Sequence, residues 1–234
     1  KVLHINSTIY INSGVMSVIM NYYKNINRDK IQFDFLYFKK IPNNSFTYEK
    51  DIRSIGGKTF ECVNLNNLHF FNKELDRILK ENKYDIVHIH DAFILKFIFK
   101  TIRKYKNIKI IIHSHATKWS DKKINSLRNW LLCLRNYKYA DYLFACSEAA
   151  GRFMFKDRDF YILNNAIDVC KFSYNADKRR QIRNKLKIDN KTVIGHVGNF
   201  NKQKNHEFII NVFEKVMFEK SDAILLLIGE GTLK

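Results

Sequence analysis

The turn from Gly198 to Lys204 combines the residue types of a phosphate-binding loop. Gly198 ends an apolar strand and lets a ligand approach the backbone, and Lys204 opens the helix that follows. A lysine at a helix N-terminus opposes the helix dipole unless an anion lies there as well. After the next apolar strand, a loop of Gly229, Glu230 and Gly231 could pass close to a nucleotide. The pattern predicts a phosphate site, and a solvated lysine is the alternative interpretation.

A second polar loop, residues 6–14, joins the first predicted strand to the first predicted helix. Asn12, Ser13 and Gly14 lie where this helix begins, so their N–H groups could bind an anion with help from the helix dipole. A helix cap and turn without any ligand would explain the same residues. The loop lacks the G-x-G-x-x-G spacing, which argues against a dinucleotide-binding fingerprint.

Two His-x-His pairs stand at the ends of predicted strands, His88 with His90 and His113 with His115. Residues two apart on a strand point to the same face, so each pair could bind a metal and would then indicate a metal-dependent hydrolase. However, one imidazole of each pair could be packed inside the sheet, and neither pair has a further cysteine or histidine nearby in the sequence. We therefore favour a single strand-end histidine hydrogen-bonded to a substrate hydroxyl, and we expect no metal.

Other polar and sulfur-containing residues are assigned structural roles. Ser147 is expected to cap a helix rather than to act as a nucleophile, because no G-x-S-x-G elbow surrounds it. The cysteines show no C-x-x-C spacing and lie in apolar segments, which indicates buried free thiols in a reducing compartment. These four residues are Cys62, Cys133, Cys146 and Cys170.

Strand and helix patterns alternate along the chain. Apolar runs predict strands at residues 2–5, 33–38, 58–63, 85–90, 108–113, 142–146 and 161–163. Helical spacing of apolar residues predicts helices around residues 16–23, 71–79, 92–105 and 125–139. Short connections and unalternating apolar strands argue for a parallel sheet covered on both faces, which binds ligands at the carboxyl ends of its strands. The predicted fold class is α/β, doubly wound.

Residues 165–190 break this alternation, because they are polar, basic and poor in strand signal. We interpret them as the crossover between a first domain at residues 1–164 and the first β-α-β unit of a second domain at residues 191–234. Asp177 is the expected N-cap of the basic helix in the crossover. The helix after Lys204 is expected to face its sheet with Ile209, Val212, Phe213 and Val216.

Composition limits the possible classes of protein. Apolar residues make up 46% of the 234 residues, enough for a packed core, and no apolar run approaches the length of a membrane span. The net charge of +18 suits nucleic acid, an anionic membrane face or phosphorylated small molecules. Because the basic residues are spread along the chain and no nucleic-acid-binding motif is present, we expect no nucleic-acid partner. We expect a cytoplasmic protein.

Taken together, these segments resemble the retaining, nucleotide-sugar glycosyltransferases of family 4, which have the two-domain GT-B fold. The resemblance is carried by HVGNFNKQKNHEF, LLLIGEGTLK and ILNNAIDVCKF, and also by VLHINSTIYINSGVMSVIMNYYKNI, DIVHIHDA, HSHAT and FACSEAAGRFMF. It covers essentially the whole chain and is nearest to the bacterial exopolysaccharide and capsule branch. It implies a complete acceptor-side Rossmann-like domain followed by the start of a donor-binding domain.

The resemblance also implies roles for single residues. Ser13 and Gly14 match the loop that approaches the donor diphosphate or the acceptor, and His115 matches a strand-end histidine that contacts the donor sugar. Lys204 matches the lysine of a basic pair that holds the diphosphate, whereas Asn199 stands where the family has an arginine. The expected donor-binding set is Ser13, Gly14, Gly198, Asn199, Lys204, Glu230 and Gly231, with His115 as the catalytic residue.

The chemistry that the resemblance implies is electrostatic. Lys204 and nearby N–H groups would stabilise the departing nucleoside diphosphate, which would also take the proton of the attacking acceptor hydroxyl. The scheme needs no metal and no cofactor, because the nucleotide sugar is a co-substrate. The family's paired glutamates lie farther along than Lys234, so we expect a truncated and inactive fragment.

The expected acceptor is a saccharide or a lipid-linked molecule, and the basic surface would hold the protein at the inner face of an anionic membrane. Two alternatives remain open at this point. One is a nucleotide-sugar epimerase on the same two-domain scaffold. The other is a non-catalytic module that binds nucleic acid or another anionic polymer.

Overall fold

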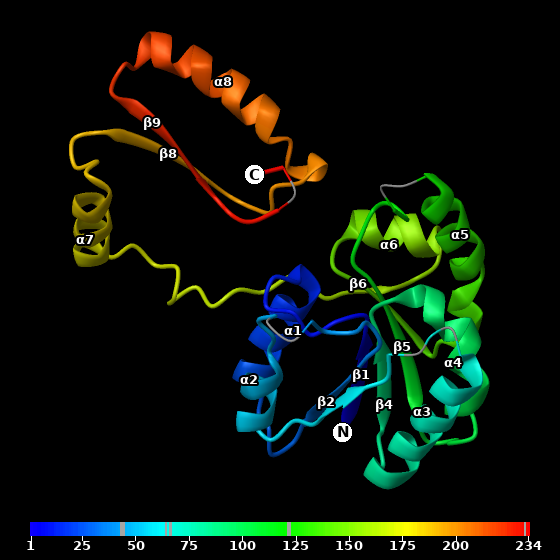
Figure 1. Cartoon of the computed structure of the whole chain (residues 1–234). Coiled ribbons are helices and arrows are strands. Elements are labelled where there is room, and N and C mark those ends of the chain that lie inside the picture. The colour runs from blue at the N-terminus through cyan, green and yellow to red at the C-terminus, as the bar shows by residue number, and fades with distance from the viewer. Residues whose placement is uncertain (43–44, 64, 66, 121–122, 232) are drawn as a thin grey trace. The chain divides into compact units, whose positions relative to one another are not determined.

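The computed structural model describes residues 1–234 except 43–44, 64, 66, 121–122 and 232 (Figure 1). The chain divides into two compact units, Lys1–Asp168 (unit 1) and Val169–Lys234 (unit 2). The domain boundaries expected from the sequence, 1–164, 165–190 and 191–234, stay a prediction.

Unit 1 is built on a seven-stranded sheet in which every pair of neighbouring strands is parallel, as the sequence predicts. The strand order is β3-β2-β1-β4-β5-β6-β7, so the winding direction reverses between the neighbours β1 and β4. Loops leave the carboxyl ends of these two strands in opposite directions and open a crevice for ligands. The strands are β1 (Val2–Asn6), β2 (Phe33–Tyr37), β3 (Thr59–Glu61), β4 (Ile86–Ile89), β5 (Lys109–Ser114), β6 (Tyr142–Ala145) and β7 (Tyr161–Ile162).

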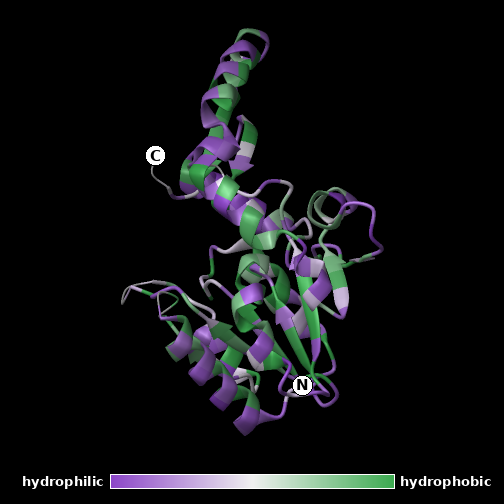
Figure 2. Ribbon diagram, turned by 90° about the vertical axis from the view of Figure 1, so that its right-hand side faces the viewer, coloured by the Kyte–Doolittle hydropathy of each residue, from purple (hydrophilic) through white to green (hydrophobic). Residues whose placement is uncertain are grey.

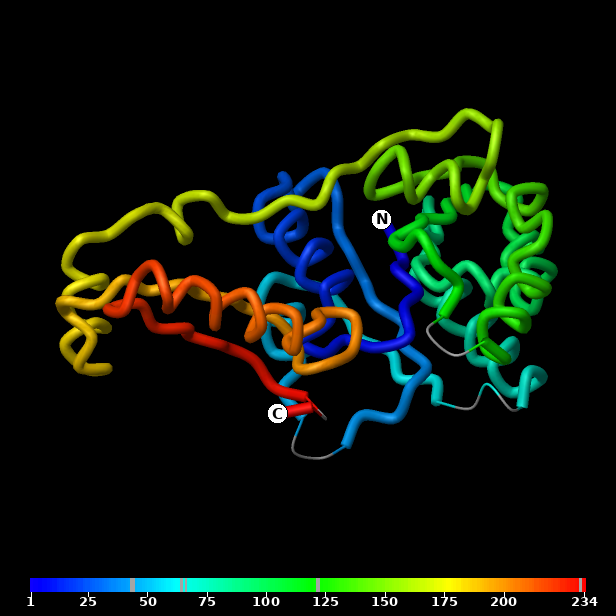
Figure 3. The backbone as a smooth tube through the Cα atoms, turned by 90° about the horizontal axis from the view of Figure 1, so that it is seen from above, coloured from blue at the N-terminus to red at the C-terminus, as the bar shows by residue number. Residues whose placement is uncertain are grey.

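Helices lie on both sides of this sheet. Figures 1 and 3 show α1 on one side of the N-terminal strand and α3, α4 and α5 on the other. The helices of unit 1 are α1 (Gly14–Asn25), α2 (Glu49–Ser54), α3 (Leu68–Asn82), α4 (Leu95–Ile102), α5 (Lys123–Cys133) and α6 (Glu148–Phe155), with the 3-10 helices η1 (Ala92–Ile94) and η2 (Asn136–Tyr139).

Alternation along the central strands decides which side chains face which helices. Leu3, Val87 and Ile110 belong to the core that also contains Phe71 and Leu75 of α3. Because successive side chains of a strand point to opposite faces, the residues between these apolar positions face the α1 side. Figure 2 shows the apolar strands of unit 1 in green between helices of mixed hydropathy. The histidines of the central strands therefore share the α1 face.

Two helices predicted as continuous are shorter than expected. The segment 92–105 forms η1 and then α4, which ends at Ile102, and the segment 125–139 is divided into α5 and η2. The division follows from Arg135, whose φ of 60° is left-handed and ends the helical path before η2. Helix α2 occupies a segment for which no helix was predicted.

Unit 2 contains α7 (Ala176–Leu186), β8 (Thr192–Val197), the 3-10 helix η3 (Lys202–Lys204), α8 (His206–Glu219) and β9 (Ala223–Ile228). β8 and β9 pair in parallel, so the predicted β-α-β unit is confirmed. The four predicted sheet-facing residues of α8 line a cavity of about 150 Å³ together with Ile194 and Leu225. The prediction for Asp177 is wrong, because Asn175 caps α7 by accepting a hydrogen bond from the Lys178 N–H, and Asp177 lies in the first turn.

The four cysteines are free, but their burial differs from the expectation. Cys62 is buried, and burial raises the pKa of its thiol to about 11. Cys133 and Cys146 are half-buried. Cys170 is exposed, so the prediction of four buried thiols is wrong there. Cys170 lies in the polar segment between β7 and α7, outside any strand or helix.

A buried carboxylate on β2 links three other segments of unit 1. Asp34 on β2 is inaccessible to solvent and accepts hydrogen bonds from the Lys58 N–H at 2.8 Å and the Tyr84 hydroxyl at 2.6 Å. The Lys1 ammonium lies 2.6 Å from the same carboxylate. Burial, and then the bond to Asp34, raise the pKa of the Tyr84 hydroxyl.

We expect Asp34→Asn to lower the free energy of unfolding by about 3–5 kcal/mol, because it leaves the Lys1 ammonium without its buried partner. Urea unfolding followed by tryptophan fluorescence measures this, since Trp119 and Trp130 both lie in unit 1. The matched control is Asp51→Asn, which breaks an exposed ion pair of 2.7 Å with Lys24 and should cost less than about 1 kcal/mol. Equal losses in the two variants would contradict the assigned role of Asp34.

Candidate active site

The loops that follow the neighbouring strands β1 and β4 are linked through Asp91. This residue is the second after the end of β4, and its carboxylate accepts a hydrogen bond of 2.6 Å from the N–H of Ser7, which directly follows β1. Burial raises the pKa of the Asp91 carboxyl, although the Ser7 N–H and the charge of Lys39 act in the opposite direction. The sequence analysis did not select Asp91 as a site residue. Its position after a His-x-His pair at a strand end is the signal that could have found it.

The loop after β1 ends at the N-terminus of α1, as predicted. Ser13 is the N-cap of α1 and accepts a hydrogen bond of 3.4 Å from the Met16 N–H. Gly14 faces open space, since a Cβ placed there would meet nothing within 4 Å. In the described part of the chain, the N–H groups of Gly14 and Val15 have no hydrogen-bond partner. This helix end therefore offers free donors and room for an anion.

Five histidines gather on the α1 face of the sheet. They come from β1, from the end of β4 and from the end of β5, and they line a cavity of about 410 Å³ whose wall also includes Ile19 and Tyr22 of α1. Their rings lie in contact, with centroids 4.4 Å apart for His88 and His90 and 4.0 Å apart for His113 and His115. The five residues are His4, His88, His90, His113 and His115.

Two hydrogen-bonded series run through these imidazoles. Nδ1 of His4 lies 2.9 Å from Nε2 of His90, and Nδ1 of His90 lies 2.8 Å from Nε2 of His115. Separately, Nε2 of His88 lies 3.2 Å from Nδ1 of His113. The predicted catalytic residue His115 is thus the end of a three-imidazole chain that begins at His4. Sequence reasoning missed His4, because its partners are residues of other strands.

The environment keeps these imidazoles neutral near pH 7. Burial lowers the pKa of His88 to about 3 and, with the neighbouring imidazoles of His115 and His88, that of His113 to about 2. Burial alone lowers the pKa of His115 to about 4. The pKa values of His4 and His90 are also lowered, first by burial and then by the other histidines. Neutral imidazoles can both donate and accept, which the chain of ring-to-ring hydrogen bonds requires.

The direction of the chain follows from its buried end. Each link needs one N–H, so if His4 donates through Nδ1, His90 also donates through Nδ1 and His115 keeps its proton on Nδ1. The reverse direction would place a proton on Nε2 of His4, which is buried and has no partner among the described residues. Orphaned buried N–H groups are rarer than orphaned acceptors. The favoured state therefore presents His115 as a donor through Nδ1.

The same histidines could also hold a metal ion. His4, His88 and His90 form one group and His90, His113 and His115 another, each with ring nitrogens within 4.8 Å of one another. A set of neutral imidazoles suits Zn²⁺, Cu²⁺ or Ni²⁺ rather than Mg²⁺ or Ca²⁺. Neither His-x-His pair has a third ligand nearby in the sequence. In the folded sheet, a histidine of a neighbouring strand completes each group of three. The expectation of no metal stays a prediction.

In unit 2, Lys204 lies in the 3-10 helix η3 and not at the start of α8, so this part of the prediction is wrong. Asn205 separates the two elements: it is left-handed with a φ of 46°, and its side chain caps α8 by accepting from the Phe208 N–H. The Lys204 N–H is bonded to the Asn201 side chain at 3.1 Å. What Lys204 offers a ligand is its exposed ammonium, which has no partner in the described part of the chain.

The predicted glycines of unit 2 allow two loops to touch. A Cβ on Gly229 would lie 1.9 Å from the Gly198 carbonyl oxygen, and one on Gly231 would lie 2.3 Å from the Phe200 carbonyl oxygen. The Phe200 N–H in turn donates to the Glu230 carbonyl at 2.9 Å. These glycines thus bring the ends of β8 and β9 together, which the sequence had attributed to the approach of a nucleotide. Asn199 and the side chain of Glu230 are exposed, and Glu230 pairs with Lys234 at 2.8 Å.

Two further histidines lie beside the same turn. His206 is buried and stacks on Phe200 with ring centroids 4.3 Å apart, and its ring meets His196 edge-on at 5.1 Å. Both ring nitrogens of His206 lack a partner among the described residues. Neither residue was predicted as a site residue, although both lie within the segment HVGNFNKQKNHEF. They pack the base of the turn that carries Lys204.

The sequence profile of Glycosyltransferase Family 4 matches residues 13–170 of this chain. EpsF of Bacillus subtilis (strain 168), a protein named as a glycosyltransferase, is 31% identical over 246 residues, covering 100% of this chain and 62% of EpsF. A 41.2 kDa protein in the cps region of Klebsiella pneumoniae is 26% identical over 236 residues, covering 92% of this chain and 60% of that protein. The chain thus spans a little under two thirds of these curated relatives.

A solved structure shares the fold along almost the whole chain. The crystal structure of HepE from Anabaena in complex with UDP and glucose matches with a TM-score of 0.75 and 13% identity, over 99% of this chain and 61% of HepE. The likeness confirms the predicted GT-B fold class. In the described part of the chain, no helix combines the length and apolar composition that a membrane span requires.

We expect acid to destabilise unit 1 in the range where free histidines take up protons. Between pH 6.5 and about 4, the unfolded chain binds protons that the buried imidazoles do not bind. The free energy of unfolding therefore falls as the pH falls, by about 1.4 kcal/mol per pH unit for each such histidine. Urea unfolding at a series of pH values, followed by tryptophan fluorescence, measures the slope.

The variant His113→Leu removes one of these groups and should reduce the slope by about 1.4 kcal/mol per pH unit. The control variant is His69→Gln on α3, where the imidazole is exposed, and it should leave the slope unchanged. A slope that is the same in His113→Leu as in the unmodified chain would contradict the neutral, buried state of His113.

Proposed function

Because this chain belongs to glycosyltransferase family 4, we propose that the whole protein containing it transfers a sugar from a nucleotide-sugar donor to an acceptor hydroxyl during synthesis of a surface polysaccharide. The observation that carries the proposal is the match of residues 13–170 to the family. The 31% sequence identity with EpsF over 100% of this chain supports the proposal. The setting in surface polysaccharide synthesis rests on the branch that the sequence resembles.

The donor is a nucleotide sugar, most simply one with a uridine diphosphate. HepE was crystallised with UDP and glucose and shares the fold of this chain. In unit 2, we assign the exposed ammonium of Lys204 to the diphosphate. In unit 1, we assign the free N–H groups of Gly14 and Val15 to an anionic or hydroxyl group of the donor or the acceptor. Asn199 adds a neutral hydrogen-bonding side chain where the family has a second cation. The proposed donor-binding residues also include Ser13, Gly198, Glu230 and Gly231.

We assign a retaining, front-side mechanism. The acceptor oxygen forms a bond to the anomeric carbon while the bond from that carbon to the diphosphate oxygen breaks, and both occur on the same face of the sugar. The leaving diphosphate oxygen takes the proton of the acceptor hydroxyl. Negative charge grows on the diphosphate during this step, so Lys204 stabilises the transition state more than the ground state.

His115 is the proposed catalytic residue of unit 1. Its Nδ1–H would donate a hydrogen bond to a hydroxyl of the donor sugar, and His90 and His4 would hold the ring in this tautomer. A lone imidazole in water exchanges between its two tautomers. In this chain, His90 and His4 would have to change their tautomers together with His115. The proposed acceptor is a saccharide or a lipid-linked molecule, and a lipid-linked acceptor would bring the protein to the face of a membrane.

The function is tested by incubating the whole protein with UDP-sugars and candidate acceptors and following both UDP release and sugar transfer. Transfer to an acceptor supports the proposal. Isomerised donor without transfer would indicate an epimerase instead. Salt-sensitive binding of random oligonucleotides, without any binding of UDP-sugars, would indicate a module for anionic polymers.

We expect Lys204→Met to reduce kcat by roughly 100-fold, since it removes a charge that acts on the leaving diphosphate. The matched control is Lys202→Met in the same 3-10 helix, which removes an equal charge two residues away. It should change kcat less than threefold, because Lys202 is not assigned to the diphosphate and an exposed charge contributes little. Steady-state kinetics of UDP release measures both. Similar losses in the two variants would show that only general positive charge matters.

We expect His115→Ala to lower kcat by roughly 100-fold, with His69→Ala as a control outside the site. Nitrogen NMR of the imidazoles gives a readout that a purely structural role would not move. In the unmodified protein at pH 7, His115 should carry its proton on Nδ1, and His90→Phe should release it to a mixture of tautomers. An Nε2 proton on His115 in the unmodified protein would refute the assigned direction of the chain.

A further inference from the structure

Helix α5 presents its apolar side chains to solvent. None of its residues is buried, and the exposed fraction is 86% for Ile124, 60% for Leu127 and 51% for Leu131. Its half-buried residues include three with amide or hydroxyl side chains, namely Asn125, Ser126 and Asn129. The Asn129 amide donates to the Trp119 carbonyl at 2.9 Å. The helix is thus inverted relative to an ordinary surface helix, which turns its apolar stripe to the core.

The exposed apolar residues form one continuous stripe, here called the α5 face. Ile124, Leu127, Leu131 and Leu134 follow the spacing i, i+3, i+7, i+10, and Trp130 lies beside them. Large apolar patches of this kind on a soluble unit indicate a partner surface. Figure 1 shows α5 along the outer side of unit 1.

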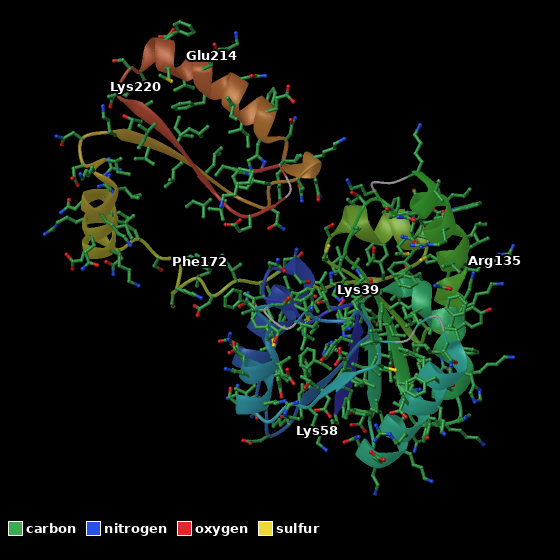
Figure 4. The ribbon with its side chains drawn as sticks, in the orientation of Figure 1. Lys39, Lys58, Arg135, Phe172, Glu214 and Lys220 are labelled. Carbon is green, nitrogen blue, oxygen red and sulfur yellow. The ribbon has the colours of Figure 1, made fainter. Side chains whose placement is uncertain are left out.

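Positive charge surrounds the α5 face. Lys123 and Arg128 on the helix, and Arg135 and Lys138 after it, are exposed. Arg135 is labelled in Figure 4 at the outer edge of unit 1. The sequence from 122 to 140 contains no aspartate or glutamate. The partner must therefore combine an apolar layer with negative charge.

A cavity of about 650 Å³ opens beside the α5 face. Both tryptophans of the chain line it, together with the cationic side chains of Arg135, Lys156 and Arg158. One carboxylate, that of Asp157, is also part of the wall. Trp119 packs on Phe153 with ring centroids 4.7 Å apart. Tryptophan beside arginine and lysine is the residue combination that favours the boundary between headgroups and acyl chains.

We propose that the α5 face docks on an anionic phospholipid membrane, with the helix in the plane of the interface, its apolar residues among the acyl chains and its cations on lipid phosphates. An interfacial helix needs this combination of apolar stripe, tryptophan and basic flanks, and it needs no membrane-spanning length. A second copy of this chain is disfavoured as the partner, because a two-fold contact would bring the same cations together.

Helix α7 is the alternative candidate for membrane docking, because it carries the densest basic cluster of the chain. Its exposed apolar residues are two, Ile182 and Leu186, whereas the α5 face has five. Charge alone would attract both helices to anionic lipid, but α5 offers much more apolar area to insert. The inference rests on the proposed function for the expectation of a membrane-held acceptor, and its test requires no sugar transfer.

The test measures binding of the whole protein to vesicles of phosphatidylglycerol and phosphatidylcholine at low salt, by co-sedimentation and by tryptophan fluorescence. We expect binding with a blue shift of the emission, since Trp130 belongs to the α5 face and Trp119 lines the cavity beside it. Ile124→Ser/Leu127→Ser should weaken binding by at least roughly tenfold. Lys123→Gln/Arg128→Gln should weaken it about 25-fold, or about fivefold for each charge.

Matched variants of α7, Ile182→Ser/Leu186→Ser and Arg179→Gln/Arg180→Gln, should change the binding less than threefold. Absence of vesicle binding by the unmodified protein would overturn the inference, as would equal losses from the α5 and α7 variants. Lipid-free dimers that the α5 variants abolish would assign the face to a second copy and overturn it too. Vesicle binding by a protein that transfers no sugar would support the docking surface and refute the proposed function alone.

Discussion

The parallel register of the central strands is the constraint on which the rest of unit 1 depends. Parallel pairing brings the carboxyl ends of β1, β4 and β5 to one edge of the sheet, and the reversal of order between β1 and β4 opens that edge. Alternation then sends Leu3 and Val87 to one face and His4 and His88 to the other. A slip of one residue in any of these strands would exchange the two sets. Core and site are therefore specified by the same register.

The histidine cluster shows how this constraint acts on chemistry. A single buried imidazole has two nitrogens to satisfy, and an apolar face offers neither a donor nor an acceptor. Strand pairing supplies other imidazoles instead, so His4, His90 and His115 satisfy one another in series. The arrangement works only while the rings are neutral, because a proton on one member would place a charge beside four other rings in a desolvated site. This packing of the imidazoles therefore requires that their pKa values be low.

The sequence predicted the seven strands of unit 1 and most of its helices in their order along the chain, because these depend on local periodicity, and it predicted a parallel sheet from their apolar, unalternating pattern. It also located Ser13 at the start of α1, because capping is a local signal. His4 and Asp91 were missed for a different reason, as each acquires its partners through strand order, which no local window contains. Lys204 was predicted to open α8, but it ends η3, because the left-handed Asn205 divides η3 from α8, which begins at His206. Asparagine tolerates the left-handed conformation as well as others, so its presence does not determine which conformation is adopted.

The orientation of α5 also depends on tertiary structure and could not be predicted from local sequence. Periodicity identified a helix in this segment, and its apolar residues have the spacing of a helix that packs against a core. Nothing in that spacing says whether the stripe meets the sheet or leaves it. In the folded chain, η1 and α4 already cover the sheet, with Ile94 and Leu95 fully buried there. α5 contributes the half-buried Cys133 to the edge of this core, whereas Ile124, Leu127 and Leu131 stay exposed. The apolar stripe therefore remains available to a surface outside the chain, and the basic residues beside it indicate which kind of surface that is.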